Sequence, residues 1–157
     1  YPPIFSSGKL GGGIAASTPK NIIWAPNNNG WPYYTKDGGV SWKPIVLPDV
    51  SAGEGFGWAY YFKRHIITAD RVNIGTFYLY HYLKGLYKTT DGGDTWTKVY
   101  TGYITDWAFY HAKLRSVPGK AGHLFFTAGQ EQLVPFKRSF DGGVTWQTLE
   151  GFTNVYD

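Results

Sequence analysis

The stretch Thr35-Lys36-Asp37-Gly38-Gly39-Val40-Ser41-Trp42 occurs two more times in this chain with small changes. The second copy, TTDGGDTW, occupies residues 89–96, and the third, SFDGGVTW, occupies residues 139–146. All three fit the pattern hydroxyl-x-Asp-Gly-Gly-x-hydroxyl-Trp. Their aspartates are separated by 54 and then by 50 residues. Self-similarity at a nearly fixed period of this size indicates a repeat architecture such as a β-propeller.

The residue types of the motif are those of a tight turn between two strands. Glycines accept positive φ angles, and the aspartate can accept hydrogen bonds from backbone N–H groups close to it. The flanking hydroxyls can join the strand ends, and the tryptophan can fold back as an apolar plug. We therefore assign structural roles to Asp37, Gly39, Trp42, Asp91, Gly93, Trp96, Asp141, Gly143 and Trp146. The alternative is a metal or acid/base role, but a functional carboxylate is seldom repeated in every structural unit.

The composition favours short strands and excludes several classes of site. Of the 157 residues, 19% are aromatic and 21 are glycine, which is typical of strands with tight turns. The chain has no cysteine, so disulfides, thiolate metal sites and a cysteine nucleophile are excluded. No apolar run approaches the roughly 18 residues of a membrane-spanning helix. We expect no cofactor, no metal ion and no membrane span.

The formal net charge is +4, from 15 basic and 11 acidic residues. The basic residues form no run longer than two, whereas nucleic-acid recognition uses a clustered basic stripe. We expect a mildly basic, solvated surface and no nucleic-acid partner.

The motif divides the chain into three units, each with four predicted strands. The strands are predicted at residues 10–17, 21–25, 31–36 and 41–47, then 65–70, 76–82, 85–90 and 95–101, then 112–117, 123–128, 134–139 and 145–149. Counted back from Asp37 and Asp91, residues 22–24 align with residues 76–78 without a gap. Gly11, Gly12 and Gly13 fall on the innermost strand, where blades crowd the propeller axis.

The predicted fold is all-β, with about three four-stranded propeller blades. The expected divisions are a connector or the end of a preceding blade at 1–9, blade one at 10–50, an aromatic loop at 51–64, blade two at 65–101, an aromatic loop at 102–110, blade three at 111–150 and the start of another blade at 151–157. Propellers close with about 4–8 blades. We therefore expect a segment of a larger propeller, or a chain that other copies complete. The absence of methionine, at residue 1 as elsewhere, favours a segment.

Five aromatic residues in the longer loops form a candidate binding surface. Strand alternation places the loops between second and third strands, and those between blades, opposite the Asp-Gly-Gly turns. The aromatic residues expected to converge there are Trp31, Trp58, Tyr60, Trp107 and Tyr110. Sugar C–H faces stack on flat rings while their hydroxyls take polar partners, so this rim is predicted to bind polysaccharide. The alternative is that the rings fill gaps between blades.

No catalytic constellation is apparent in the sequence. Glycoside cleavage needs two carboxylates that flank the scissile bond, and only Glu54 and Asp106 lie in the aromatic loops. Asp70 and Arg71 are predicted to form a structural ion pair at a strand end. The four histidines lack metal-ligand spacing and evident triad partners, so surface or core roles are expected for His65, His81, His111 and His123.

The repeated motif resembles the Asp-box, a structural β-hairpin of propeller blades in sialidases, sortilin-type receptors and xyloglucanases. The order of further motifs resembles the C-terminal propeller of glycoside hydrolase family 74, over residues 10–156. These motifs are Gly11-Gly12-Gly13 with Ala16-Ser17, Trp24-Ala25-Pro26, Tyr33-Tyr34-Thr35, Ala69-Asp70-Arg71-Val72-Asn73 with Thr76-Phe77-Tyr78, and Val117-Pro118-Gly119 with Gly122-His123-Leu124.

The resemblance implies a segment of a secreted hydrolase of xyloglucan or a related β-1,4-glucan. Members of the family have two seven-bladed propellers face to face, and they invert the anomeric centre with one aspartate from each propeller. This chain resembles the part that follows the second catalytic aspartate, so no catalytic residue is carried over. The expected partners are a polysaccharide and the remaining blades, from the same chain or other copies. The alternatives are a non-catalytic Asp-box propeller with a glycan-binding or structural, self-assembling role, and a sortilin-like receptor, which the lack of cysteine disfavours.

Overall fold

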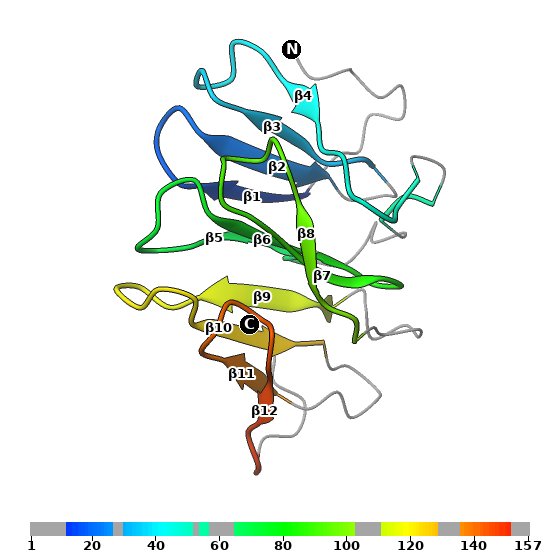
Figure 1. Cartoon of the computed structure of the whole chain (residues 1–157), viewed down its shortest axis with the longest axis vertical. Coiled ribbons are helices and arrows are strands. Elements are labelled where there is room, and N and C mark those ends of the chain that lie inside the picture. The colour runs from blue at the N-terminus through cyan, green and yellow to red at the C-terminus, as the bar shows by residue number, and fades with distance from the viewer. Residues whose placement is uncertain are drawn as a thin grey trace.

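The computed structural model describes residues 12–26, 30–51, 54–56, 65–102, 111–128 and 136–151. Their strands form three four-stranded antiparallel sheets, each built from strands that follow one another along the chain (Figure 1). This confirms the all-β architecture of three four-stranded units. The segments 1–11 and 152–157, and most of the two aromatic loops, lie outside the described residues. In the part that is described, no helix is long and apolar enough to cross a membrane.

Each sheet is a simple meander. Blade one contains β1 (Gly12–Ala16), β2 (Ile22–Pro26), β3 (Tyr33–Thr35) and β4 (Lys43–Pro44). Blade two contains β5 (Ile67–Ala69), β6 (Phe77–His81), β7 (Gly85–Thr89) and β8 (Thr97–Tyr100). Blade three contains β9 (Lys113–Ser116), β10 (Leu124–Thr127), β11 (Lys137–Ser139) and β12 (Gln147–Thr148). Except for Pro26, every strand residue lies within a predicted strand.

The pairing register corrects the gapless alignment of the first two units. Ile22 pairs with Thr35, and Phe77 pairs with Thr89. Thr35 and Thr89 both stand two residues before the motif aspartate, so Ile22 is equivalent to Phe77 and not to Thr76. The predicted alignment was therefore wrong by one residue, because one more residue lies between Ile22 and Thr35 than between Phe77 and Thr89.

The inner strands β1, β5 and β9 lie next to one another (Figure 1). A Cβ atom at Gly12 would lie 2.5 Å from the Ala25 carbonyl oxygen, and one at Gly13 would lie 3.1 Å from Ile67 Cγ2 in the next blade. The backbone thus approaches its neighbours closely at both glycines, as predicted for the innermost strand. Gly11 lies outside the described residues.

The hydrophobic core lies between the sheets. Its largest fully buried apolar side chains include Ile23 of blade one, Phe77 and Leu79 of blade two, and Leu114 and Leu124 of blade three. Burial of such side chains stabilises the fold by roughly 1.5–3 kcal/mol each. Packing between successive sheets therefore holds the three blades side by side.

Candidate functional site

The three Asp-Gly-Gly turns have the same hydrogen-bond pattern. In the first turn, the Thr35 hydroxyl donates to Asp37 Oδ1 (2.6 Å), and the Ser41 backbone N–H (3.0 Å) and hydroxyl (2.5 Å) donate to the same carboxylate. Gly39 N–H donates to Thr35 Oγ1 (3.0 Å). Residues 89–95 and 139–145 repeat these contacts. The motif carboxylates are thus engaged in closing their own turns.

The motif tryptophans close the turns from the other side. Each indole Nε1–H donates to the carbonyl of the second glycine, at 3.2 Å in the first turn, 3.1 Å in the second and 2.9 Å in the third. That glycine has φ of 96° at Gly39, 109° at Gly93 and 87° at Gly143, a region that L side chains rarely adopt. These contacts support the structural roles assigned to the motif residues.

The same hydrogen bonds make the turns sensitive to acid. Donation from Ser41 lowers the pKa of Asp37. Burial opposes the shift at Asp141, but hydrogen bonds from Thr145 outweigh it and lower that pKa to about 2. These folded-state pKa values lie below the roughly 3.9 of an aspartate in the unfolded chain. The ionised carboxylates therefore stabilise the folded state, and this stabilisation is fully present above about pH 4. It is lost as the pH falls from about 4 to about 2.

We therefore expect the free energy of unfolding to fall steeply between pH 4 and pH 2. Urea unfolding of the intact polypeptide at several pH values, followed by tryptophan fluorescence, measures this slope. The variant Asp141→Asn should show a smaller slope in the same window, since one depressed carboxyl group is removed. An identical slope in the variant and the wild type would contradict this cause.

Contacts between blades involve polar pairs that the sequence did not predict. The Tyr34 hydroxyl donates to Asp94 Oδ1 (2.7 Å), and Lys36 forms an ion pair with the same carboxylate. Asn21 Nδ2 donates to the Gly92 carbonyl (2.9 Å), and Gly75 N–H donates to Ser17 Oγ (2.7 Å). Blade one is thereby attached to the second Asp-Gly-Gly turn. The sequence offered one sign of these contacts between blades. Gly75 and Gly122 each stand two residues before the second strand of their blade, β6 and β10.

Asp70 attaches blade two to blade three. Its carboxylate accepts from the N–H groups of Val72 (2.9 Å), Asn73 (2.8 Å) and Gly122 (2.8 Å), and from the Tyr78 hydroxyl (3.2 Å). Burial opposes ionisation, yet these donors lower the pKa of Asp70. No ion pair joins Asp70 to Arg71, although both are described. The predicted ion pair was wrong because nearby backbone donors satisfy the carboxylate.

We expect Asp70→Ala to lower the free energy of unfolding by about 2–4 kcal/mol, because it leaves the Gly122 N–H and the Tyr78 hydroxyl without their acceptor. The matched control is Arg71→Ala, for which a change within about 0.5 kcal/mol is expected. Urea unfolding of the intact polypeptide measures both. A loss for Arg71→Ala as large as for Asp70→Ala would restore the ion-pair interpretation.

His81 has the core role that was predicted for the histidines. Its side chain is fully buried, with Nδ1 accepting from Leu83 N–H (3.2 Å). That assignment makes Nε2 the protonated nitrogen, which donates to the Gly55 carbonyl (2.7 Å). The imidazole is neutral and has a partner at each nitrogen. Among the described residues, no group of three or more His, Asp or Glu is placed to hold a metal ion.

Trp31 is the one predicted rim aromatic that the structure describes. Its indole Nε1–H donates to the Ile45 carbonyl (2.7 Å), and its ring meets Phe56 edge-on with centroids 5.4 Å apart. The side chain is half-buried against the core. The other members, Trp58, Tyr60, Trp107 and Tyr110, lie outside the described residues, as does Asp106.

The described acids near this end, Asp49 and Glu54, are held in ion pairs. Glu54 lies 2.9 Å from Lys84 Nζ and accepts from Ser51 N–H (2.7 Å), and the Lys84 interaction lowers the pKa of Glu54. Asp49 accepts from the Tyr87 hydroxyl and forms an ion pair with Lys98. Glu54 thus remains ionised near neutral pH, whereas a general acid must be protonated.

Comparisons with known proteins agree with this architecture. The BNR/Asp-box repeat family matches residues 33–44 and 137–148. Xyloglucanase Xgh74A of Acetivibrio thermocellus is 34% identical over 129 residues, which cover 81% of this chain and 13% of that protein. The chain therefore spans only a small part of the relative's length.

Solved structures show the same fold. The GH74 enzyme of Niastella koreensis superposes with a TM-score of 0.66 at 16% identity, over 92% of this chain and 23% of that one. YCF48 from Cyanidioschyzon merolae has a TM-score of 0.61 at 14% identity, over 96% of this chain and 42% of that one. The chain is a segment of an Asp-box β-propeller that resembles the propellers of glycoside hydrolase family 74.

Proposed function

We propose that this chain is part of a hydrolase of xyloglucan or a related β-1,4-glucan. In that enzyme it supplies a wall of aromatic residues that binds the polysaccharide, but it supplies no catalytic acid. The observation that carries the proposal is the 34% identity to a xyloglucanase over 81% of the chain. A role in such an enzyme makes the protein extracellular, since its polymeric substrate cannot enter a cell intact.

The described carboxylates support a non-catalytic role for this segment. Apart from the exposed Glu150, each described carboxylate closes a turn, joins two blades or belongs to an ion pair. An inverting glycosidase needs one protonated and one ionised carboxyl group on either side of the bond. The catalytic pair is therefore proposed to lie outside the described residues of this chain.

The binding wall is proposed at the end of the blades opposite the Asp-boxes. Its members are Trp31, Trp58, Tyr60, Trp107 and Tyr110. Because the Trp31 indole N–H is already bonded to Ile45, this residue can offer a sugar only its ring. The Glu54–Lys84 ion pair lies at the same end and provides polar neighbours for sugar hydroxyls.

Further blades of the same polypeptide are proposed to cover blade one. The pairing register makes Ile14 equivalent to Ile67 and Leu114. Ile14 is 60% exposed, whereas both equivalents are 0% exposed against the preceding blade. The aliphatic side chain of Ile14 is therefore suited to burial against a preceding blade. The relative is much longer than this chain, so its length leaves room for such a blade.

The proposal is tested by a reducing-sugar assay on xyloglucan with the intact polypeptide. Release of xyloglucan oligosaccharides is expected, with retained activity when Glu54 is replaced by Gln. Binding of xyloglucan without release of sugars would instead assign a non-catalytic glycan-binding propeller. Neither binding nor release would overturn the proposal and leave a structural role.

A further inference from the structure

The first aromatic loop, residues 51–64, begins against the end of β6. His81 Nε2 donates a hydrogen bond to the Gly55 carbonyl (2.7 Å). The Phe56 ring meets the His81 imidazole edge-on, with centroids 4.7 Å apart. In the sequence, Gly55 and Phe56 come just before Trp58 and Tyr60 of the proposed wall. His81 therefore holds this loop immediately ahead of two residues on which polysaccharide binding is proposed to depend.

The same imidazole belongs to a chain of aromatic rings. Phe56 contacts both His81 and Trp31, and its ring centroid lies 5.4 Å from that of Trp31. The imidazole also stacks on Tyr82, with centroids 5.3 Å apart and ring planes 21° apart. Phe56 and His81 are fully buried, whereas Trp31 and Tyr82 are half-buried. The buried pair thus supports two half-buried rings at the end of the blades where the wall is proposed.

The loop has a second attachment to blade two, the Glu54–Lys84 ion pair. Its side chains are 35% and 29% exposed, so water screens the pair, and such ion pairs contribute little to stability. The Gly55 carbonyl, by contrast, accepts from a side chain that is fully buried, and loss of a buried donor leaves its acceptor unsatisfied. His81 is therefore the stronger of the two attachments.

We propose that His81 is a positioning residue for polysaccharide binding, which orients Trp31 through Phe56 and holds the aromatic loop at the Gly55 carbonyl. This inference rests on the proposed function, because it concerns the same wall. His81 itself is too deeply buried to touch a sugar. Rings that are held in place before the substrate arrives lose less freedom on binding. Loss of the anchor should therefore weaken substrate binding and leave the chemical step unchanged.

Two substitutions separate the hydrogen bonds of His81 in the intact polypeptide. The Asn oxygen of His81→Asn can replace Nδ1 as the acceptor for Leu83 N–H, but nothing then donates to Gly55. The amide nitrogen of His81→Gln can replace Nε2 as the donor to Gly55. Steady-state kinetics on xyloglucan should show KM raised at least about fivefold in His81→Asn with kcat within about twofold, the pattern of lost uniform binding. In His81→Gln both constants should stay within about twofold of the wild type.

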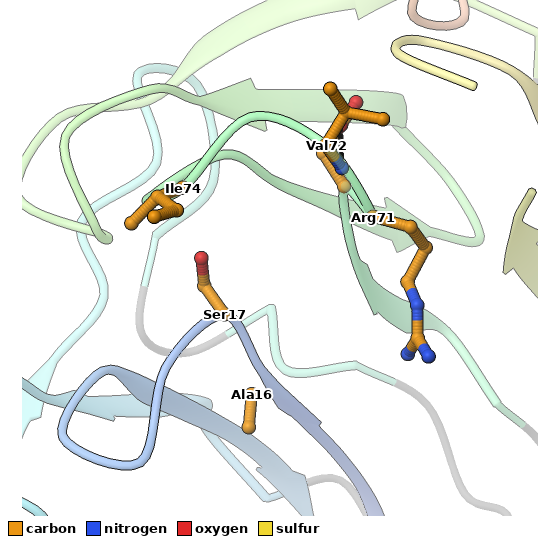
Figure 2. Close-up of a pocket in the computed structure, with 6 residues that line it drawn as sticks. Ala16, Ser17, Arg71, Val72 and Ile74 are labelled. Carbon is orange, nitrogen blue, oxygen red and sulfur yellow. Dashed lines mark hydrogen bonds between the residues drawn. The ribbon is translucent and has the colours of Figure 1, made fainter. Parts of the chain in front are cut away.

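Ser17 provides a matched control at the Asp-box end. Its Oγ accepts from Gly75 N–H (2.7 Å), so it too attaches blade two to the preceding part of the chain by one hydrogen bond. Figure 2 shows Ser17 pointing toward the loop that carries Val72 and Ile74, at a hollow of about 280 Å³. Ser17→Ala therefore removes a contact between blades at the end opposite the wall. Its KM should stay within about twofold of the wild type.

Hydrogen exchange followed by mass spectrometry measures the anchor without substrate. Peptides that contain residues 51–56 should exchange at least about tenfold faster in His81→Asn than in the wild type, because local opening is governed by local contacts. His81→Gln should exchange within about threefold of the wild type. His81→Phe keeps an aromatic ring against Phe56 but donates nothing to Gly55, and it should exchange as fast as His81→Asn.

The outcomes distinguish this inference from the proposed function. Equal exchange in His81→Asn and His81→Gln would overturn the Gly55 anchor, whatever the xyloglucan assay shows. Faster exchange with an unchanged KM would leave His81 a core residue only, and an equal rise of KM in Ser17→Ala would also overturn the positioning role. If the wild type binds xyloglucan without cleaving it, the dissociation constant takes the place of KM. A wild type that does neither overturns both proposals, whereas failure of the positioning role alone is seen only in the variants.

Discussion

Replacing Gly85 by alanine is expected to lower the free energy of unfolding by about 3–5 kcal/mol, the largest single effect outside the core. Gly85 begins β7 with φ of 107°, a conformation in which alanine is strained. A Cβ atom there would lie 2.0 Å from the Tyr100 carbonyl oxygen and 2.9 Å from the Tyr100 carbonyl carbon. Both are backbone atoms of β8, so the strand itself must move, and such overpacking typically costs about 1–3 kcal/mol in addition to the strain.

Gly119 provides a matched control for this substitution. Its φ of 71° is also positive, but a Cβ atom there would have no neighbour within 4 Å. Gly119→Ala should therefore lower the free energy of unfolding by only about 1–2 kcal/mol, the cost of the backbone conformation. Urea unfolding of both variants in the intact polypeptide separates the two effects. Equal losses would mean that β8 adjusts freely and that the close approach to Tyr100 is not limiting.

The blades could be predicted from the sequence because the chemistry of the Asp-box is local. Thr35, Asp37 and Ser41 close a turn within seven residues, so the pattern of residue types alone identifies it. The twelve strands follow from these turns and from the aromatic and β-branched runs between them. The fold class, confirmed by the structure and by similar solved structures, therefore needed no knowledge of packing.

The contacts between blades could not be predicted in the same way. The donors to Asp70 include Gly122, 52 residues later in the chain, while the sequence neighbour Arg71 forms no ion pair with it. Which partner satisfies a carboxylate depends on how the sheets pack, and a charge of opposite sign next in sequence is a poor guide when backbone N–H groups are closer. The Tyr34–Asp94 contact escaped prediction for the same reason.

The register error has a related cause. Counting residues from the motif assumes that the connection between the second and third strands has a constant length. That connection surrounds Gly30 in blade one and is the short turn 82–84 in blade two. Connections vary in length among repeats because they lie at the surface, where an added residue disturbs no packing. The same variability is why the aromatic loops are the proposed place for function.

In the intact polypeptide, Trp58→Ala and Trp107→Ala are each expected to raise KM for xyloglucan about tenfold with kcat nearly unchanged. A sugar face stacked on an indole ring is worth about 1.4 kcal/mol, or a factor of ten. A wall far from the reacting carboxylates binds substrate and transition state equally, and loss of such uniform binding appears in KM alone. Steady-state kinetics on xyloglucan measures both constants.

Phe140→Ala is the matched control, because Phe140 is an exposed aromatic residue at the Asp-box end. Its replacement should leave KM within twofold of the wild type. Trp31→Ala is a poorer test, since it also removes the hydrogen bond to Ile45 and the contact with Phe56. An equal rise of KM in Phe140→Ala, or none in the Trp58 and Trp107 variants, would contradict the wall. A fall in kcat instead would place these residues near the reacting bond, since only interactions strengthened in the transition state act on that constant.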